Sequence, residues 1–308
     1  MSDTVVERSE HAIAKGSQSF AAAARLFQRE TRQDAVMLYA WCRHCDDVID
    51  GQIAGHGQAE DFREGQKRRL DELREQTDAA LSGQASGDYI FEALQRVVTR
   101  HDIPHRHPQE LLTGFAMDVE DRQYRTIDET LEYCYHVAGV VGVMMAMIMG
   151  VRDRAVLDRA CDLGLAFQLT NIARDVIDDA RAGRVYVPED VLLRHGITKI
   201  TPDDRGQWPS LHAAALDLLD LAEGYYTSAY AGISALPPRS AWAIAAARRV
   251  YRAIGEKLRK GGPEAWEQRV STTRNDKILL LAAGLGDIAA TRFYRNPPPR
   301  EGLWQRPV

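Results

Sequence analysis

The sequence has few cysteines and lacks the patterns of a secreted or disulfide-bonded protein. Its 308 residues contain four cysteines, at positions 42, 45, 134 and 161, which are too few and too scattered for a disulfide framework. Cys42-Arg-His-Cys45 is a CxxC pair inside a helical pattern without a second pair, so we expect buried thiols and no zinc or redox site. The amino terminus has neither a basic nor a long apolar segment, which indicates a cytoplasmic protein.

An excess of positive charge is also missing. Lys and Arg number 39 against 44 Asp and Glu, which gives a formal net charge of −5. This balance argues against a nucleic-acid partner and against a strongly basic membrane-binding patch. Acidic substrates would therefore need metal ions or locally placed arginines.

The sequence shows no run of alternating apolar and polar residues bounded by hairpin turns, the pattern of β-strands. Apolar residues instead recur at helical spacing in nearly every segment, which predicts an all-α fold. No linker divides the chain, so we expect a single helical domain, residues 1–308, with its core at about 16–292 and a proline-containing tail at 293–308. Within the tail, Asn296-Pro-Pro-Pro-Arg300 is expected to be a stiff surface segment.

Glycine and proline residues separate the expected helices. These helices are at about residues 33–50, 61–81, 90–101, 109–121, 137–151, 153–182, 208–232, 239–260 and 275–292. Gly183 ends the sixth helix and begins a loop or short lid at 183–188. Gly284-Leu-Gly286-Asp-Ile-Ala289 matches a dinucleotide-binding pattern, but no strand precedes it, so we interpret it as a helix-packing sequence.

The stretch at residues 168–179 carries polar side chains with the spacing of one helix face. Asn171, Asp175 and Asp179 follow one another at intervals of four residues, so an amide and two carboxylates share that face. Like charges one turn apart repel by roughly a few tenths of a kcal/mol. Such a face in the protein interior indicates a bound cation, and hard divalent metals suit these oxygen ligands.

A second acidic cluster, Asp46-Asp47-Val-Ile-Asp50, repeats this arrangement. Asp46 and Asp50 are one turn apart and Asp47 lies beside them, in the last turn before the helix-stopping Gly51. Carboxylates there oppose the helix dipole, at a cost of roughly 0.3–1 kcal/mol each without a counter-charge. We expect the two acidic faces to meet across one cavity.

The apolar segment at 137–151 is 15 residues long, which is too short to span a bilayer and suits a buried core helix. Ala138, Gly142, Ala146 and Gly150 form a strip of small residues along it. Two interpretations stay open, namely close packing against another helix and an open wall for a long apolar ligand. At 1.5 Å per residue the strip is roughly 18 Å long, the scale of an extended twenty-carbon chain.

The order of these motifs closely resembles the squalene and phytoene synthase family, and most closely its bacterial phytoene synthases. The motifs are Asp46-Asp47-Val-Ile-Asp50, Gly114-Phe-Ala-Met-Asp118-Val, Tyr135-His-Val-Ala-Gly-Val-Val-Gly142, the stretch 168–179 and Gly183-Arg-Val-Tyr-Val-Pro188. The resemblance covers about residues 16–274. It implies a single-domain α-helical prenyltransferase in which two acidic helices face each other across a central cavity.

The resemblance also implies roles for particular residues. The implied ligands of Mg²⁺, for which Mn²⁺ is an alternative, are Asp46, Asp50, Asn171, Asp175 and Asp179, with Asp47 and Asp118 nearby. The implied diphosphate clamps and cation-shielding groups are Tyr39, Arg43, Arg174, Arg184, Arg269 and Tyr251, and looser matches to site positions are Ser17, Phe20 and Gln168. Taken alone, Arg184 and Arg269 are more typical of ordinary salt bridges.

The implied reaction is head-to-head condensation of two molecules of geranylgeranyl diphosphate to phytoene through prephytoene diphosphate, with release of diphosphate. NADPH is not expected, because no nucleotide fold is visible, although reductive members of the family also lack a Rossmann motif. ATP is implied by the resemblance alone, since the sequence has no P-loop. The resemblance allows a peripheral membrane contact for product release.

Three alternatives stay open at this point. A dehydrosqualene or squalene synthase would use C15 substrates with the same machinery. A class I terpene cyclase also has acid-rich helices, but it lacks this set of intervening motifs. A non-catalytic helical assembly factor of the same family should have lost carboxylates, whereas every acidic position is intact here.

Overall fold

The computed structural model describes residues 4–16, 23–51, 63–84, 87–293 and 298–307, and these residues form helices, turns and loops but no strand. The prediction of an all-α fold is confirmed. The α-helices are α1 (Thr4–Gly16), α3 (Arg29–Asp50), α4 (Gln66–Leu81), α5 (Tyr89–His101), α6 (Arg106–Val119), α7 (Ile127–Cys134), α8 (Val140–Ile148), α9 (Arg154–Arg181), α10 (Glu189–Arg194), α11 (Trp208–Gly232), α12 (Pro238–Gly261) and α13 (Arg274–Arg292).

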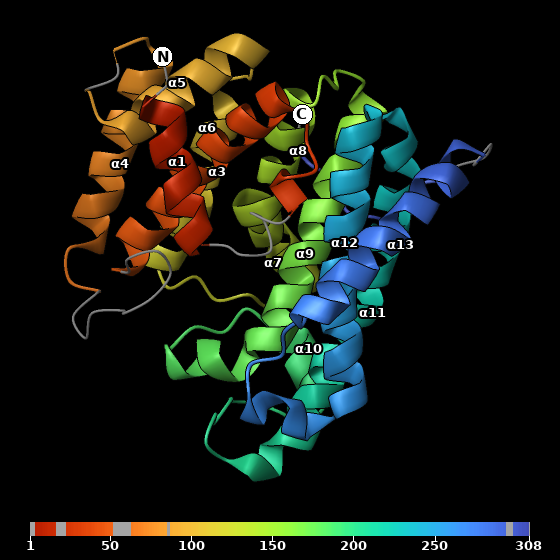
Figure 1. Cartoon of the computed structure of the whole chain (residues 1–308). Helices are drawn as coiled ribbons and strands as arrows, with labels where there is room; N and C mark the ends of the chain where they lie inside the picture. The colour runs from red at the N-terminus through yellow and green to blue at the C-terminus, as the bar shows by residue number, and fades with distance from the viewer. Residues whose placement is uncertain (1–3, 17–22, 52–62, 85–86, 294–297, 308) are drawn as a thin grey trace.

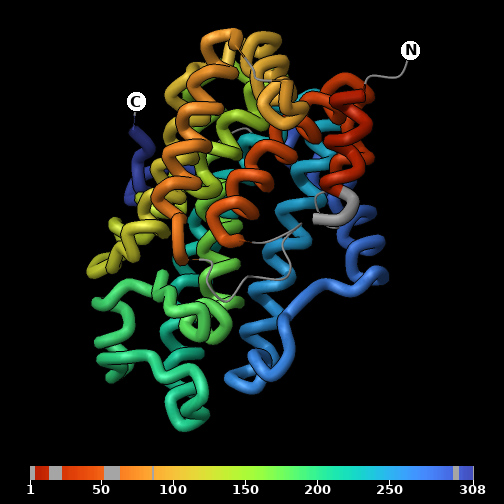
Figure 2. The backbone as a smooth tube through the Cα atoms, turned by 90° about the vertical axis from the view of Figure 1, so that its left-hand side faces the viewer, coloured from red at the N-terminus to blue at the C-terminus, as the bar shows by residue number. Residues whose placement is uncertain are grey.

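These helices form two groups, with α7 and α8 between them (Figure 1). α1 and α3 to α6 make up one group, and α9 with α11 to α13 makes up the other. Figure 2 turns the molecule by 90° and shows α10 and the segment that follows it at one end. At 28 residues α9 is long enough to contact α7, α8, α11 and α12, and α8 in turn contacts α3, α5 and α6, so α8 links α9 to the other group.

One cluster of buried apolar side chains extends from Val5 in α1 to Trp266 beyond α12. All four cysteines lie in it as free thiols, as expected. Gly284 of α13 lies close to α12, because a Cβ there would be 3.2 Å from the backbone nitrogen of Ala246. The helix-packing interpretation is confirmed for Gly284, whereas a Cβ on Gly286 would meet no atom within 4 Å.

Helix ends differ from the predicted ones by a few residues. α3 begins at Arg29 and ends at Asp50, where Gly51 adopts a left-handed φ of 61° and its N–H bonds to the carbonyl of Asp47. α4 begins at Gln66, later than predicted. The short helices α7 and α10, which have only eight and six residues, were not predicted from the sequence.

The apolar helix is longer than predicted at its start and shorter at its end. Helical structure is continuous from Ile127 through a π-helical turn, η1 (Tyr135–Gly139), to Ile148, a run of 22 residues. By length and composition this run could cross a membrane, yet 67% of its most apolar window is buried inside the protein. Since it packs against α6 and α9, it is a core helix, and core helices pass the same test of length and composition.

The segment after α9, residues 183–188, is a loop that packs against α7, as one of its two interpretations predicts. Gly183 adopts a left-handed φ of 76°, which turns the chain at the end of α9. Tyr186 and Val187 are then buried, and the carbonyl of Tyr186 accepts a hydrogen bond from Thr130 at 3.0 Å.

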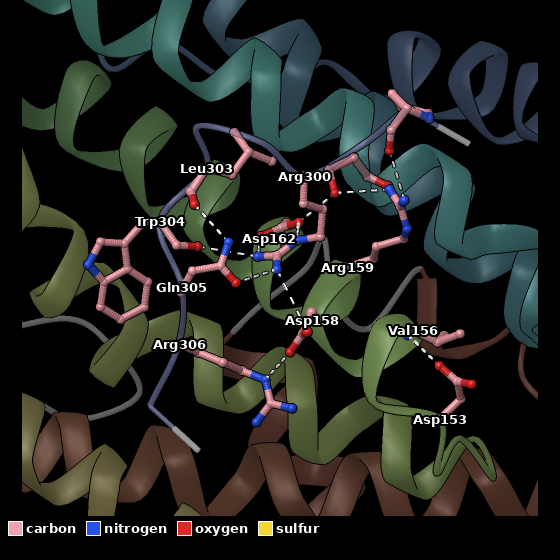
Figure 3. Close-up of polar contacts among 12 residues, drawn as sticks. Asp153, Val156, Asp158, Arg159, Asp162, Arg300, Leu303, Trp304, Gln305 and Arg306 are labelled. Carbon is pink, nitrogen blue, oxygen red and sulfur yellow. Dashed lines mark hydrogen bonds and ion pairs between the residues drawn. The ribbon is translucent and has the colours of Figure 1, made fainter. Parts of the chain in front are cut away.

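The described part of the carboxyl-terminal tail, residues 298–307, lies on the surface with Pro299 exposed, and it is anchored to α9 by arginines in a way that the sequence did not predict (Figure 3). Arg300 donates to both carboxylate oxygens of the fully buried Asp162, at 2.8 and 2.7 Å. Arg306 pairs with Asp158 at 2.6 Å, one turn earlier on α9. Both arginine side chains are largely buried, so these ion pairs belong to the interior of the protein.

Candidate active site

A cavity of about 410 Å³ lies between the two helix groups and is lined by side chains of α3, α6, α8, α9, α12 and α13. Small-molecule pockets commonly measure about 300–1,000 Å³. α9 gives the cavity a direction, because its lining residues extend from Val156 to Asn171, roughly 22 Å at 1.5 Å per residue. Gln168 and Asn171 mark a polar end, which Asp46 and Asp118 share, and most of the remaining lining is apolar.

The acidic cluster of α3 is neutralised by arginines. Arg43 donates to Asp46 at 2.8 Å and to Asp47 at 2.7 Å, which are one turn further along the same helix. Asp50 pairs at 2.6 Å with Arg184, which lies in the loop after α9. This pair links α3 to the loop after α9, and Asp46 of α3 and Asn171 of α9 line the same cavity, so the two acidic helices border one cavity as predicted.

On α9, Asn171, Asp175 and Asp179 share one face as predicted. Arg174 binds both carboxylate oxygens of Asp175, one of them at 2.7 Å from its Nε, and Arg269 approaches the same carboxylate at 3.4 Å. The amide nitrogen of Asn171 donates to Gln168 at 3.3 Å. Its Oδ1 is buried and accepts no hydrogen bond from the described residues.

The electrostatics of the polar end oppose ionisation of several carboxyl groups. Burial raises the pKa of Asp46 to about 7, with Arg43 opposing this shift and Asp50 adding to it. The side chain of Asp46 is still 39% exposed, because it borders the cavity. Burial and the charge of Asp175 raise the pKa of Asp179 well above its usual range. A cation placed among these groups would favour their charged forms.

Asp118 has hydrogen-bond partners that the sequence did not reveal. Tyr186 donates to one of its carboxylate oxygens at 2.8 Å and Tyr133 to the other at 3.2 Å, and the two tyrosine rings stack with centroids 4.7 Å apart. Burial raises the pKa of Asp118 to about 6, while Arg184 opposes the shift. Tyr186 lies in the motif at residues 183–188, whereas Tyr133 lies two residues before the motif that begins at Tyr135, and no local spacing indicates that either tyrosine holds Asp118.

The residues at the polar end fit a hard divalent cation by their chemistry. Carboxylate and amide oxygens are the donors that Mg²⁺ takes, usually with substrate phosphates and water completing the octahedron. The buried, unbonded Oδ1 of Asn171 is such a donor. Among the described residues no three His, Cys, Asp or Glu side chains converge closely enough to hold a metal by themselves. In this structure Asp46, Asp50 and Asp175 are each paired with an arginine.

The strip of small residues both packs closely against another helix and forms part of the cavity wall. A Cβ on Gly142 would lie 2.4 Å from the backbone oxygen of Ala160 in α9, so this glycine permits close helix packing. Ala138, Gly142 and Ala146 nevertheless line the cavity. Gly150 is not part of the strip, because α8 ends at Ile148 and Gly150 has a left-handed φ of 90°.

Aromatic side chains surround the junction between the polar and apolar parts. Tyr39 and Tyr251 both line the cavity, as their predicted roles require. Tyr251 stacks on Phe167 with ring centroids 4.0 Å apart, a contact that the sequence did not suggest. Ser17 and Phe20, the remaining predicted site residues, lie outside the described residues.

This chain is similar to proteins of a well-populated family. The family model for squalene/phytoene synthase matches residues 13–276. The chain is 57% identical over 307 residues to the 15-cis-phytoene synthase of Paracoccus sp. (strain N81106 / MBIC 01143), covering 100% of this chain and 99% of that protein. It is 51% identical over 299 residues to the 15-cis-phytoene synthase of Pantoea ananas, covering 96% of each.

Solved structures show the same architecture. A dehydrosqualene synthase in complex with ligand matches with a TM-score of 0.80 at 26% identity, over 93% of this chain and 97% of that chain. The squalene synthase HpnC from Alicyclobacillus acidocaldarius matches with a TM-score of 0.73 at 24% identity, over 84% and 94% of the two chains. The second likeness concerns the fold alone.

Proposed function

Because this chain belongs to the squalene/phytoene synthase family, we propose that it is a prenyltransferase that condenses two molecules of geranylgeranyl diphosphate head to head into 15-cis-phytoene. Relatives more than half identical over nearly the whole chain carry that activity in their names. The structural observation that carries the proposal is a cavity with Arg43, Asp46 and Asn171 at one end and a mostly apolar lining elsewhere. Such a cavity suits a diphosphate head with a long hydrocarbon tail.

Four arginines are the proposed diphosphate-binding groups. Arg43 lines the polar end of the cavity, and Arg174, Arg184 and Arg269 lie beyond its lining on aspartates of the two acidic motifs. Guanidinium groups bind phosphate oxygens through parallel hydrogen bonds. Substrate binding would therefore exchange part of the aspartate contacts for contacts with phosphate.

The aspartates released from these pairs, together with Asn171, are the groups that we propose to hold Mg²⁺. When bound, Mg²⁺ supplies positive charge that neutralises the departing diphosphate. The desolvated environment of Asp46, Asp118 and Asp179 makes their charged forms costly without a cation. These residues would thus be poised to receive one, and Tyr133 and Tyr186 would hold Asp118 in place.

The aromatic groups beside the polar end have a separate proposed role. Loss of diphosphate from an allylic substrate leaves a carbocation, and ring faces attract positive charge. Tyr251, stacked on Phe167, lines the cavity close to Arg174. We assign these rings to shielding the cation until the second substrate's double bond reacts with it.

Product analysis tests this proposal directly. The purified protein is incubated with Mg²⁺ and either geranylgeranyl or farnesyl diphosphate, and the extracted hydrocarbon is identified by mass spectrometry. We expect a C40 hydrocarbon from the first substrate and little product from the second. A preference for the C15 substrate would establish the dehydrosqualene or squalene synthase alternative, and no product from either would establish a non-catalytic protein.

A further inference from the structure

The apolar part of the cavity is lined by a charged side chain, that of Arg159 on α9. Arg159 lies twelve residues before Asn171, roughly 18 Å away along the helix at 1.5 Å per residue. That separation is the scale of an extended twenty-carbon chain. A hydrocarbon chain whose diphosphate lies at the polar end would therefore have its far end at Arg159.

The side chain of Arg159 is held at both of its ends. Its Nη1 donates to the carbonyl oxygen of Ser228 at 3.0 Å and to the hydroxyl oxygen of the same residue at 3.2 Å. Its Nη2 donates to the carbonyl oxygen of Pro298 at 2.9 Å. A Cβ on Gly232 would lie 3.1 Å from the Cβ of Arg159, so the base of the side chain packs closely on α11. Arg159 is therefore a fixed part of the cavity wall.

The carboxyl-terminal tail supplies one of these contacts and is itself anchored nearby (Figure 3). Arg300 of the tail binds both carboxylate oxygens of Asp162, which lies three residues after Arg159 on α9. Ser228 donates its hydroxyl hydrogen to the same carboxylate. The fully buried Asp162 thus holds both segments, the tail and α11, whose carbonyl oxygens bind Arg159.

A charged and hydrogen-bonded wall resists a hydrocarbon chain more strongly than an apolar side chain of the same length does. An apolar side chain can change its rotamer to make room. To move the guanidinium of Arg159 aside, a chain would have to break its hydrogen bonds and place the charge against hydrocarbon. The position of Arg159 and its anchoring together give a stop at a defined distance from the polar end.

We propose that Arg159 is the stop that sets the longest hydrocarbon chain the cavity accepts, and that the carboxyl-terminal tail holds it in place. This inference rests on the proposed function, which gives the accepted chain twenty carbons. The strip of small residues on α8 has a different position, because it forms a side wall, whereas Arg159 lies near one end of the α9 lining. Shortening Arg159 should therefore admit a chain that is longer by one isoprene unit.

Substrates that differ by one isoprene unit test this stop. kcat/KM is measured with geranylgeranyl (C20) and geranylfarnesyl (C25) diphosphate for wild type, Arg159→Ala and Arg159→Met. We expect the C25-to-C20 ratio to rise at least about tenfold in Arg159→Ala, because the added unit then fits an apolar space. Arg159→Met should give a smaller rise, since methionine is flexible and cannot form the hydrogen bonds. Arg154→Ala, at an exposed position of the same helix, is the control and should keep the wild-type ratio.

Binding gives a second readout that needs no turnover. Saturated C20 and C25 alkyl diphosphates lack the allylic double bond and cannot ionise, so calorimetry in the presence of Mg²⁺ measures their dissociation constants. The wild type should prefer the C20 compound, and Arg159→Ala should lose that preference.

Unchanged C25-to-C20 ratios in both Arg159 variants would overturn the proposal, as would an equal rise in Arg154→Ala. Circular dichroism checks the fold. If Arg159→Ala does not fold, Arg159→Met decides alone, because an unbranched side chain of similar size fills the same space. Absence of turnover with both C20 and C15 substrates would reject the proposed function, whereas the ratio of dissociation constants would still test the stop.

Discussion

Aspartates with the same spacing in the sequence have different electrostatic environments in the folded protein. Asp50 has a partner in Arg184 at 2.6 Å, and both side chains are mostly buried. Asp179, by contrast, lies among carboxylates, and burial together with Asp175 raises its pKa well above its usual range. The first residue contributes an ion pair to the fold, while the charge of the second opposes folding. The two are therefore separable by experiment.

Replacing Asp50 by Ala should destabilise the protein, whereas replacing Asp179 by Asn should not. The Asp50 change removes the carboxylate that Arg184 binds at 2.6 Å, which should lower the free energy of unfolding by about 1–3 kcal/mol. The Asp179 change removes a charge that burial disfavours, so the stability should hold or rise. Both variants should lose turnover, because both residues are proposed metal ligands. Urea unfolding and a product assay measure the two effects.

Glu92 provides a control, since its contact with Arg96 at 4.0 Å is a surface pair. Glu92→Gln should change stability by less than about 1 kcal/mol and leave turnover intact. Equal destabilisation in the Asp50 and Asp179 variants would contradict the assigned environments. Normal turnover in either variant at saturating Mg²⁺ would exclude that residue as a ligand.

Sequence spacing predicted which acidic residues share a helix face but not what they contact. Asn171, Asp175 and Asp179 share a face because the helical repeat alone requires it. The partners of Asp118 could not be predicted in the same way, since Tyr186 is 68 residues away along the chain. Asp162 and Arg300 are 138 residues apart, so their ion pair depends on the whole fold. Local patterns carry no information on such distances.

At the scale of elements, the contact between α8 and α9 decides the shape of the cavity wall. A Cβ on Gly164 of α9 would lie 2.3 Å from the backbone oxygen of Ala138, and a Cβ on Gly142 of α8 would lie 2.4 Å from that of Ala160. The two backbones therefore approach so closely that neither position accepts a side chain. The part of α8 that does not contact α9 lines the cavity, for example through Val141 and Met145.

Gly142→Ala should destabilise the protein by about 2–3 kcal/mol, because the added methyl group forces two helix backbones apart. An alanine in a helix is otherwise more stable than a glycine by roughly 0.5–1 kcal/mol. Gly224→Ala, in α11, is the matched control, since its Cβ would meet only a side-chain atom of Leu303 at 3.5 Å. Thermal unfolding of both variants should give shifts of opposite sign, and a neutral Gly142→Ala would show that the helices are further apart.

At the scale of the whole molecule, the two helix groups meet at the polar end of the cavity. α3 contributes Asp46 and Asp50 from one group, and α9 contributes Asn171 and Asp175 from the other. Arg184 already connects the groups through Asp50. A ligand that bound acidic residues of both helices at once would add further connections, and its binding energy would then appear as stability of the whole fold.

We therefore expect Mg²⁺ with inorganic diphosphate to raise the melting temperature by several degrees and EDTA to reverse the shift. Binding at about one hundred times the dissociation constant stabilises a fold by about 2.7 kcal/mol. EDTA should also stop hydrocarbon formation from geranylgeranyl diphosphate and from prephytoene diphosphate, because both steps release diphosphate. NADPH should leave the product unchanged. A reduced hydrocarbon on addition of NADPH would place the chain among the squalene synthases, and full activity in EDTA would reject the metal site. In Asp175→Ala, whose carboxylate is a proposed ligand, the thermal shift should shrink even though the protein remains folded, which separates loss of the metal from loss of the structure.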